Sequence, residues 1–350
     1  YMPVKLLKSK AEEAREKFLG IESVRDLASL LEVSYPTLVW HASRSEQEDQ
    51  YHCFEIPKRS GEPRQITAPI TAIKIIQTKL NWLLQLVHQP RNSTFGFVPC
   101  RNVVKNAAKH RRQRYVFNLD LKSFFPSINF GRVRGLFLAE PFNLAPEVAT
   151  TLARLACHKN SLSQGAPSSP VISNMICWKM DKDLQILASK NSAVYTRYAD
   201  DITFSTSIPE FPTDICKYDD SVGKYTVGSA LLSLIEGNGF KVNERKVRLQ
   251  WSRSRQEVTG LIVNTRVNVK RSFISELRAM LHDWQRNDLK AAEQNFRNHY
   301  VKNRHSSKPP PLFRDVVRGK LGYLAMVRGK EDRLYLHYLE KFNRLNRRPR

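Results

Sequence analysis

The stretch VYTRYADDITFS, residues 194–205, places two adjacent acids between two segments of strand-forming residues. Residues 194–198 and 202–204 are rich in β-branched and aromatic side chains, which favour strands. Asp200 and Asp201 lie in the turn, where neighbouring carboxylates repel each other and are desolvated by the strands. The stretch therefore predicts a β-hairpin whose turn binds a cation, and a site built of oxygen ligands favours Mg²⁺.

A third acid, Asp120, lies near the end of the apolar segment YVFNLDL at 115–121. An acid at the end of a buried strand is poorly explained as a solvated surface residue. Asp120 lies eighty residues before Asp200, so only a sheet could bring the two together. On neighbouring strands, Asp120, Asp200 and Asp201 would form a two-metal site for in-line phosphoryl transfer, in which the ions activate the attacking hydroxyl and stabilise the transition-state charge.

A second pair of adjacent acids, Asp219 and Asp220, follows Tyr218. The surrounding sequence, CKYDDSVGKY, is polar and shows no strand pattern on either side. We predict an exposed loop at this position, unrelated to the acids at 200 and 201.

The composition points to a folded protein with a polyanionic partner. The chain of 350 residues carries 57 Lys and Arg against 33 Asp and Glu, a net charge of +24, and 41% of its residues are hydrophobic, which excludes a disordered polyelectrolyte. An acidic protein or an anionic membrane surface could also supply the negative charge. No apolar run approaches the length of a membrane-spanning helix, and we expect neither a membrane span nor a secretory signal.

The basic residues gather toward the C-terminus. Residues 301–350 hold 14 Lys and Arg against four acids. A solvated basic face would explain the charge alone, but aromatic residues such as Tyr323, Tyr335 and Phe342 lie between the charges. Arginine and aromatic side chains together suit RNA, which offers phosphates and unstacked bases.

The hydrophobic pattern predicts an α+β core with helices at both ends of the chain. Helices are predicted at 5–43, 71–88, 102–114, 130–139, 146–157, 170–189, 226–237 and over most of 273–350, with a break at 306–311. Strands are predicted at 51–70, with a turn at 60–63, and at 115–121, 193–206, 240–250 and 257–270.

The run SVRDLASLLEVSYPTL, residues 23–38, resembles a helix-turn-helix. Two interpretations are open: a DNA-binding unit, or a helical pair that packs on the main domain. We favour the packed pair, because the second helix lacks strongly basic residues.

The cysteines are odd in number and form no C-x-x-C pair. We therefore expect neither a disulfide framework nor a zinc site, and the reducing cytosol is the compartment that fits best. Each is predicted to be a small buried hydrophobe: Cys53, Cys100, Cys157, Cys177 and Cys216.

Four motifs together resemble those of reverse transcriptases. YADD at 198–201 resembles the Y-x-D-D box, and Asp120 followed by Phe124-Phe125 resembles the first palm motif. SQGAPSSPVISN at 163–174 is similar to the Q-G-x-x-x-S-P motif, and GEPRQI at 61–66 to a fingers motif whose Arg contacts the triphosphate. Their order and spacing agree over about residues 50–265.

Two further boxes narrow the resemblance to bacterial retron reverse transcriptases. NAAKH at 106–110 is similar to the N-A-x-x-H box of that family, and VTG at 258–260 matches its V-T-G box. The whole chain follows the family, except that residues 207–227 look like a local insertion.

The resemblance implies a right-hand polymerase with three parts: a helical N-terminal extension at 1–44, fingers and palm at 45–265, and a basic helical, RNA-binding thumb at 266–350. It implies RNA-templated DNA synthesis from dNTPs with two Mg²⁺ ions, or Mn²⁺ as a substitute. The implied partners are a structured non-coding RNA that is template and primer, the DNA product, and an effector protein in anti-phage defence. In that family a guanosine 2′-OH primes synthesis, which gives a branched RNA–DNA product (msDNA) in the bacterial cytoplasm.

The resemblance also assigns roles to residues of the active site. It implies metal ligands at Asp120, Leu121, Asp200 and Asp201, the three aspartates being catalytic. Contact with the dNTP is implied for Arg64, Phe124, Phe125, Gln164 and Lys246, with Phe125 as the steric gate against a 2′-OH. Lys241 competes with Lys246 for its role, Lys58 is a possible helper of Arg64, and core packing is the alternative for Phe125.

Primer, template and RNA contacts complete the expected site. Tyr198, Gly165 and Gly260 are expected near the primer and template. RNA contacts are expected from Asn106, His110, Arg314, Arg318, Lys320 and Arg328, and for His110 a structural role is the alternative.

Two other functions compete with the retron hypothesis. One is another bacterial reverse transcriptase, either intron-encoded or an untemplated defence polymerase. The other is a catalytically silent RNA-binding protein on a decayed polymerase fold. The intact Asp120, Arg64 and Gln164 argue against a silent protein.

Overall fold

The computed structural model describes residues 10–44, 47–57, 63–302 and 310–347, and these residues form two compact units. The first unit comprises the chain up to Arg101 together with Phe117–Phe204 and Ile208–Leu249. The second comprises Asn102–Val116, Ser205–Ser207 and the chain from Gln250 onward. Each unit is built around a hydrophobic cluster of its own.

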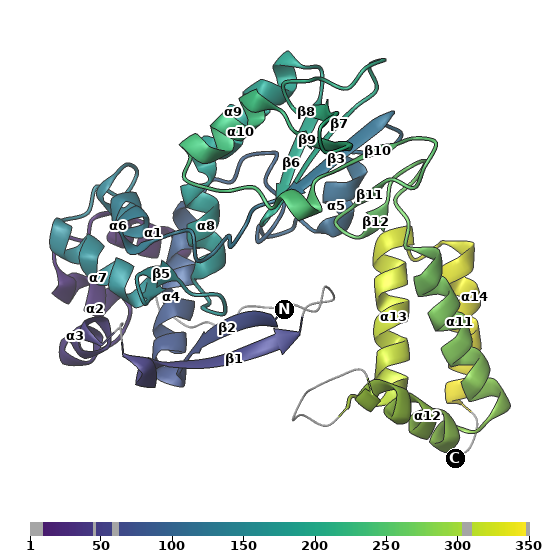
Figure 1. Cartoon of the computed structure of the whole chain (residues 1–350). Helices are drawn as coiled ribbons and strands as arrows, with labels where there is room; N and C mark the ends of the chain where they lie inside the picture. The colour runs from purple at the N-terminus through teal and green to yellow at the C-terminus, as the bar shows by residue number, and fades with distance from the viewer. Residues whose placement is uncertain (1–9, 45–46, 58–62, 303–309, 348–350) are drawn as a thin grey trace. The chain divides into compact units, whose positions relative to one another are not determined.

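A four-stranded sheet positions the acids that the sequence singles out (Figure 1). Its strand order is β10–β3–β7–β6, from strands at Arg248–Trp251, Tyr115–Asp120, Asp201–Thr206 and Val194–Tyr198. All six residues of β3 are buried, as is β7 from Ile202 onward. The predicted hairpin and the predicted buried strand are confirmed, and β3 is the neighbour of β7.

Helices of the first unit pack against one another and against this sheet. They are α4 (Thr71–Val87), α6 (Phe130–Leu138), α7 (Pro146–Ala156), α8 (Ser169–Ile176), α9 (Trp178–Lys190) and α10 (Ser229–Gly237). Helix α4 buries one apolar stripe, from Ile73 to Val87, as its helical periodicity predicts. The single helix predicted at 170–189 is instead two helices, with Cys177 between them.

The N-terminal helices belong to the same core. They are α1 (Ala11–Leu19), α2 (Val24–Leu30) and α3 (Tyr35–Ser43), and α2 begins with a capping box between Ser23 and Asp26. Leu27 and Leu38 are fully buried in the cluster, and α2 and α3 both contact α7. The helical pair at 23–38 therefore packs on the main domain, which confirms the favoured interpretation.

Short strand pairs complete the first unit. They are β1 (Tyr51–Pro57) with β2 (Pro63–Pro69), β4 (Cys157–His158) with β5 (Ser161–Leu162), and β8 (Cys216–Asp219) with β9 (Lys224–Val227). Single-turn helices lie at Glu48–Gln50 and Glu244–Lys246. Residues 58–62, including Lys58 and most of the turn predicted at 60–63, lie outside the described residues.

The second unit combines a small strand pair with a bundle of helices. Its elements are α5 (Val103–Ala108), β11 (Glu257–Val258), β12 (Leu261–Ile262), α11 (Arg271–Arg286), α12 (Leu289–Lys302), α13 (Phe313–Arg328) and α14 (Arg333–Asn346). Helices α11, α13 and α14 run side by side and α12 contacts α11 and α13 (Figure 1). The predicted break at 306–311 lies between α12 and α13, largely outside the described residues.

Three further expectations from the sequence are wrong. The helix predicted at 102–114 ends at Ala108, and turns follow it. The acids at 219 and 220 lie in the β8–β9 hairpin rather than in a loop without strands, and Tyr218 packs edge-on against Tyr225 across that hairpin. Cys53 and Cys100 are exposed, because Cys53 lies on the two-stranded β1–β2 hairpin and Cys100 in a turn, whereas the other three cysteines are buried.

Among the described residues, no helix combines the length and the apolar character that crossing a lipid bilayer would take.

Candidate active site

The sheet brings Asp120 to the turn that holds Asp200 and Asp201. Strand β3 ends at Asp120, and the next backbone N–H, that of Leu121, donates a hydrogen bond of 3.0 Å to the carbonyl oxygen of Asp200. Asp120 is 5% exposed. The juxtaposition of residues eighty positions apart is thus the result of the β3–β7 pairing, as the sequence predicts.

The turn between β6 and β7 has a constrained backbone. Ala199 has a φ of 58°, in the left-handed region that non-glycine residues seldom adopt. The Arg197 guanidinium donates a 3.0 Å hydrogen bond to the Ala199 carbonyl oxygen. This bond holds the turn in the conformation that presents Asp200 and Asp201.

The electrostatics of the three acids show that they lie close together. Burial and then the charge of Asp120 raise the pKa of Asp200. Burial, followed by the charges of Asp200 and Asp120, raises the pKa of Asp201 to about 7. The Asp201 side chain borders solvent, so repulsion from the charges of Asp200 and Asp120 is the main physical cause of this rise. The site therefore holds more negative charge than it can neutralise with its own protein groups.

Lys246 partly offsets this charge. Its ammonium donates a 2.7 Å hydrogen bond to the Asp120 carboxylate and forms an ion pair with it. Burial lowers the pKa of Lys246, but the hydrogen bond and the charge of Asp120 outweigh it and raise the pKa overall. Of the two lysines considered, Lys246 is thus the one with an ion pair at the acids, while the backbone carbonyl of Lys241 accepts a bond from Lys122.

The donor chemistry of the three acids fits a hard divalent cation. Carboxylate oxygens are the ligands that Mg²⁺ takes, and a bound ion would relieve the mutual repulsion of the acids. In the described part of the chain, however, no group of three or more His, Cys, Asp or Glu is arranged to hold a metal ion. The carboxyls are neighbours, and that of Asp120 is engaged by Lys246.

Two elements carry the residues expected to hold the triphosphate. Arg64 is exposed on β2, and its charge lowers the pKa of Asp200, which opposes the rise caused by burial and by Asp120. Gln164 is half-buried, and its carbonyl oxygen accepts a bond from the Thr67 N–H of β2. A Cβ on Gly165 would lie 2.9 Å from the Thr67 carbonyl oxygen, and Gly165 has a φ of 133°. The requirement for glycine here therefore comes from close approach to β2.

The two aromatic residues after Asp120 differ in exposure. Phe125 is half-buried, whereas Phe124 is 5% exposed and stacks on Phe240 with ring centroids 5.7 Å apart. The Phe124 side chain thus packs in the core, and its expected contact with a dNTP stays a prediction. Tyr198, at the end of β6, is half-buried, and the Leu121 side chain is buried, so Leu121 could serve a metal only through its backbone.

Three residues of the 106–110 box, Asn106, Ala107 and His110, are interior residues of the second unit, whereas Ala108 and Lys109 are exposed. Asn106 is 1% exposed, and His110 is fully buried and hydrogen-bonded to Ser205 Oγ at 2.7 Å. Burial favours a structural role for both side chains, and their expected contact with RNA stays a prediction. Gly260 lies with Thr259 in the turn between β11 and β12.

The basic residues expected to bind RNA on α13 fall into two groups. The Lys320 side chain is 18% exposed and pairs with Glu276 at 2.9 Å, and Arg328 is 10% exposed and forms a two-pronged pair with Asp332. These ion pairs stabilise the helical bundle, and contact of Lys320 and Arg328 with RNA stays a prediction. Arg318 is 61% exposed and Arg314 is half-buried, so both remain candidates for contact with RNA.

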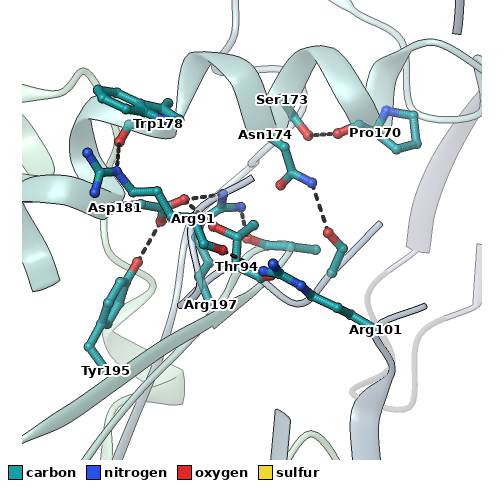
Figure 2. A network of polar contacts seen from close by, with 12 residues as sticks. Arg91, Thr94, Arg101, Pro170, Ser173, Asn174, Trp178, Asp181, Tyr195 and Arg197 are labelled. Carbon is teal, nitrogen blue, oxygen red and sulfur yellow. Dashed lines mark hydrogen bonds and ion pairs between the residues drawn. The ribbon is translucent and has the colours of Figure 1, made fainter. Parts of the chain in front are cut away.

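A buried polar network behind the catalytic turn is absent from the sequence-based expectations (Figure 2). Arg197 and Asp181 are 0% and 1% exposed and form a two-pronged pair, with both nitrogen–oxygen distances 2.7 Å. The hydroxyls of Tyr195 and Thr94 also donate to the Asp181 carboxylate. An Arg between strand-forming residues next to the acids is a signal for such a pair, but nothing in the sequence identifies Asp181 as its partner.

Known proteins resemble most of this chain in sequence. The profile of the family described as "Reverse transcriptase (RNA-dependent DNA polymerase)" matches residues 56–263. Retron Mx65 reverse transcriptase of Myxococcus xanthus is 34% identical over 303 residues, which cover 81% of this chain and 68% of that protein. Retron Ec86 reverse transcriptase of Escherichia coli is 29% identical over 301 residues, which cover 84% and 82% of the two chains.

Among solved structures, the telomerase of Candida albicans in complex with a fragment of telomeric RNA aligns with a TM-score of 0.43 and 11% identity. The alignment covers 84% of this chain and 63% of that one.

Proposed function

The chain belongs to the retron reverse transcriptases, and we propose that it copies a dedicated structured RNA into DNA. Reverse transcriptases are RNA-dependent DNA polymerases with a right-hand fold. The observation that carries the proposal is that the sheet brings Asp120 next to the turn with Asp200 and Asp201. The positive charge of Arg64 acts on the same group of acids, since it lowers the pKa of Asp200. We propose fingers and palm at 45–265, a thumb at 266–350 and an N-terminal extension at 1–44.

The reaction joins a primer hydroxyl oxygen to the α-phosphorus of a dNTP and releases pyrophosphate. In this proposal Arg64 and Gln164 hold the incoming nucleotide, and charge-assisted hydrogen bonds from the Arg64 guanidinium bind the triphosphate. Lys246 is released from Asp120 toward the phosphates as the nucleotide enters. Phe125 packs beneath the sugar and excludes a 2′-OH by steric clash.

We propose Asp120, Asp200 and Asp201 as the residues that hold divalent metal ions, with Mg²⁺ as the ion and Mn²⁺ as a substitute. When bound, such ions lower the pKa of the attacking hydroxyl and neutralise charge on the phosphate oxygens. The crowding of negative charge that raises the pKa of Asp201 supports this assignment.

Replacing Asp200 and Asp201 by Asn tests the catalytic assignment. The double variant should lose DNA synthesis and keep its RNA affinity, because the acidic ligands vanish while the basic surface remains. Primer extension and RNA binding are measured on one preparation. Asp219→Asn with Asp220→Asn is the matched control, because those acids lie on the β8–β9 hairpin. Synthesis near the wild-type rate in the Asp200/Asp201 variant would remove these residues from the mechanism.

We further propose that the product is msDNA, a DNA whose 5′ end is joined to an internal RNA 2′-OH. A folded RNA can hold a 2′-OH in line with the α-phosphate, so that it replaces a 3′-OH as nucleophile. Nucleic acid that co-purifies with the protein is treated with ribonuclease, with and without debranching enzyme. Ribonuclease alone should leave a few ribonucleotides on the DNA, and debranching should expose a 5′-phosphate. An ordinary 3′–5′ link would refute the branch and leave the polymerase assignment standing.

The remaining part of the proposal concerns partners. The retron family suggests a bacterial cytoplasmic protein that acts with an effector protein in defence against phage. Expression of the chain with its adjacent genes, with and without the Asp200→Asn and Asp201→Asn changes, tests this by phage plating. Protection that survives loss of synthesis would separate defence from the polymerase.

A further inference from the structure

The segment from Ser93 to Phe97 lies along the outer edge of β6. The Arg197 N–H donates to the Ser93 carbonyl oxygen, and the Phe95 N–H donates to the Arg197 carbonyl oxygen, both at 2.8 Å. Thr94 and Arg197 thereby form a parallel bridge. Because β6 is the last strand of the sheet, this segment covers its edge and follows it toward the catalytic turn.

Side chains from two helices anchor the segment (Figure 2). The Thr94 hydroxyl donates to Asp181 of α9 at 2.7 Å, and the Asn174 amide of α8 donates to the Gly96 carbonyl oxygen at 2.8 Å. Asp181 and Asn174 are almost fully buried. The path of the segment is therefore fixed by the same network that holds Arg197.

Gly96 brings this segment into contact with the backbone of the turn. A Cβ on Gly96 would lie 2.3 Å from the Ala199 nitrogen and 2.9 Å from the Tyr198 carbonyl carbon. Any side chain at this position would displace the backbone that presents Asp200. The residue after Gly96 is consequently held beside the active site.

That residue is Phe97, and its conformation is unusual. It has a φ of 60°, which is rare for a bulky side chain and costs free energy. Phe97 is 41% exposed, so burial in the core does not offset this strain. Its centroid lies 6.1 Å from that of Phe125. The fold thus holds an apolar ring in a strained conformation, partly open to solvent, next to the proposed sugar gate.

We propose that Phe97 is a nucleotide-binding residue that forms, with Phe125, an aromatic wall against which the sugar and base of the incoming dNTP pack. The inference rests on the proposed polymerase function and deepens it by adding a contact residue from outside the recognised motifs. Aromatic rings bind nucleotides by stacking and by contact with the apolar faces of sugars. The strain and the exposure of Phe97 are then explained, because its partner is the substrate.

Steady-state synthesis tests the role of Phe97 in the full chain, on a heteropolymeric RNA template with an annealed DNA primer. Phe97→Ala should raise the KM for each dNTP about tenfold, the loss expected for one stacking contact, with kcat changed less than about twofold. Phe97→Tyr should restore the KM, because the ring is kept. An unchanged dNTP KM, or a change confined to the KM for the primer–template, would overturn the proposal.

Phe97→Gly separates the ring from the backbone. Glycine adopts a φ of 60° without strain, so this variant removes the ring and relieves the backbone. Equal increases of KM in Phe97→Gly and Phe97→Ala assign the effect to the ring, and a normal KM in Phe97→Gly contradicts the proposal. Tyr218→Ala is the matched control, because it removes an aromatic ring that is 51% exposed on the β8–β9 hairpin.

The proposed function and the role of Phe97 can be refuted independently of each other. If the Asp200→Asn and Asp201→Asn variant keeps its synthesis, the proposed function fails whatever Phe97 does. If that variant is inactive and Phe97→Ala has the wild-type dNTP KM, the role of Phe97 alone is refuted.

Discussion

Phe125 shows how one side chain can set the chemistry of the product. It is half-buried, five residues after Asp120, while its neighbour Phe124 is in the core. Phe125→Val should raise incorporation of ribonucleotides relative to deoxyribonucleotides by roughly 10- to 200-fold, because the smaller side chain leaves room for a 2′-OH. Single-nucleotide incorporation with matched dNTP and rNTP measures the ratio. Unchanged discrimination would assign Phe125 to core packing.

His110 makes a prediction about stability and pH. Burial, followed by the charge of Lys109, lowers its pKa to about 3. Below pH 6.5 the unfolded chain therefore takes up a proton at His110 that the folded chain does not, and stability falls with falling pH until about pH 3. His110 thereby changes the free energy of unfolding by up to about 1.4 kcal/mol per pH unit.

His110→Gln removes this dependence and can keep a hydrogen bond to Ser205. Free energies of unfolding of both proteins, measured by denaturant between pH 5 and 7, should show a shallower slope for the variant. The raised pKa of Asp201 adds a contribution of the opposite sign, since stability from that group is lost as pH rises toward 7, but it is common to both proteins. Identical slopes would mean that His110 is protonated in the folded state.

At the scale of elements, the contact between α9 and β6 depends on the Asp181–Arg197 pair. Removing one partner of a buried pair leaves the other charge without compensation. Asp181→Ala should therefore lower the free energy of unfolding by about 3–5 kcal/mol. It should also slow synthesis, because Arg197 would no longer be fixed where it holds the Ala199 carbonyl.

The matched control replaces both partners by apolar residues, Asp181→Leu with Arg197→Met. Its stability should lie closer to the wild type, because no unpaired charge is buried. Its synthesis should stay impaired, since the bond to Ala199 is absent. Recovery of both properties in the double variant would show that Arg197 has no part in holding the turn.

At the scale of the whole molecule, the charge of +24 dictates how RNA affinity responds to salt. Neutralising six to ten phosphates implies a loss of affinity of about 10³–10⁵ between about 50 and 200 mM salt. RNA-binding titrations at several salt concentrations give the slope of the logarithm of the affinity against the logarithm of the salt concentration. A slope near zero would show that the cationic surface does not contact the phosphates.

Single variants identify which charges contribute to that slope. Arg318→Ala should reduce it by about one phosphate contact, because this side chain is 61% exposed. Lys320→Ala should leave the slope unchanged and lower stability, because Lys320 pairs with Glu276 and lies over the Phe273 ring. Deleting 312–350 would not isolate the charge, because α13 and α14 supply buried residues of the second core.

The sequence by itself determined the elements with strong local signals. The acids within strand-forming residues specified the β6–β7 hairpin, and the apolar run that ends in Asp120 specified β3, because the type and alternation of neighbouring side chains are local properties of the chain. The motifs also identified the family, because each of them is a short run of neighbouring residues. Predictions of short elements were wrong. The helix predicted at 102–114 ends at Ala108, and residues 216–227 pair as a hairpin in place of the predicted loop.

The tertiary structure alone decided which side chains are free to act. His110, Phe124, Lys320 and Arg328 belong to motifs or basic segments, yet their neighbours in space bury or pair them. The partner of Arg197 could not be deduced either, since any acid of the chain was a candidate until α9 packed on β6. Exposure and pairing are properties of contacts between residues distant in the chain, and a linear pattern does not contain them.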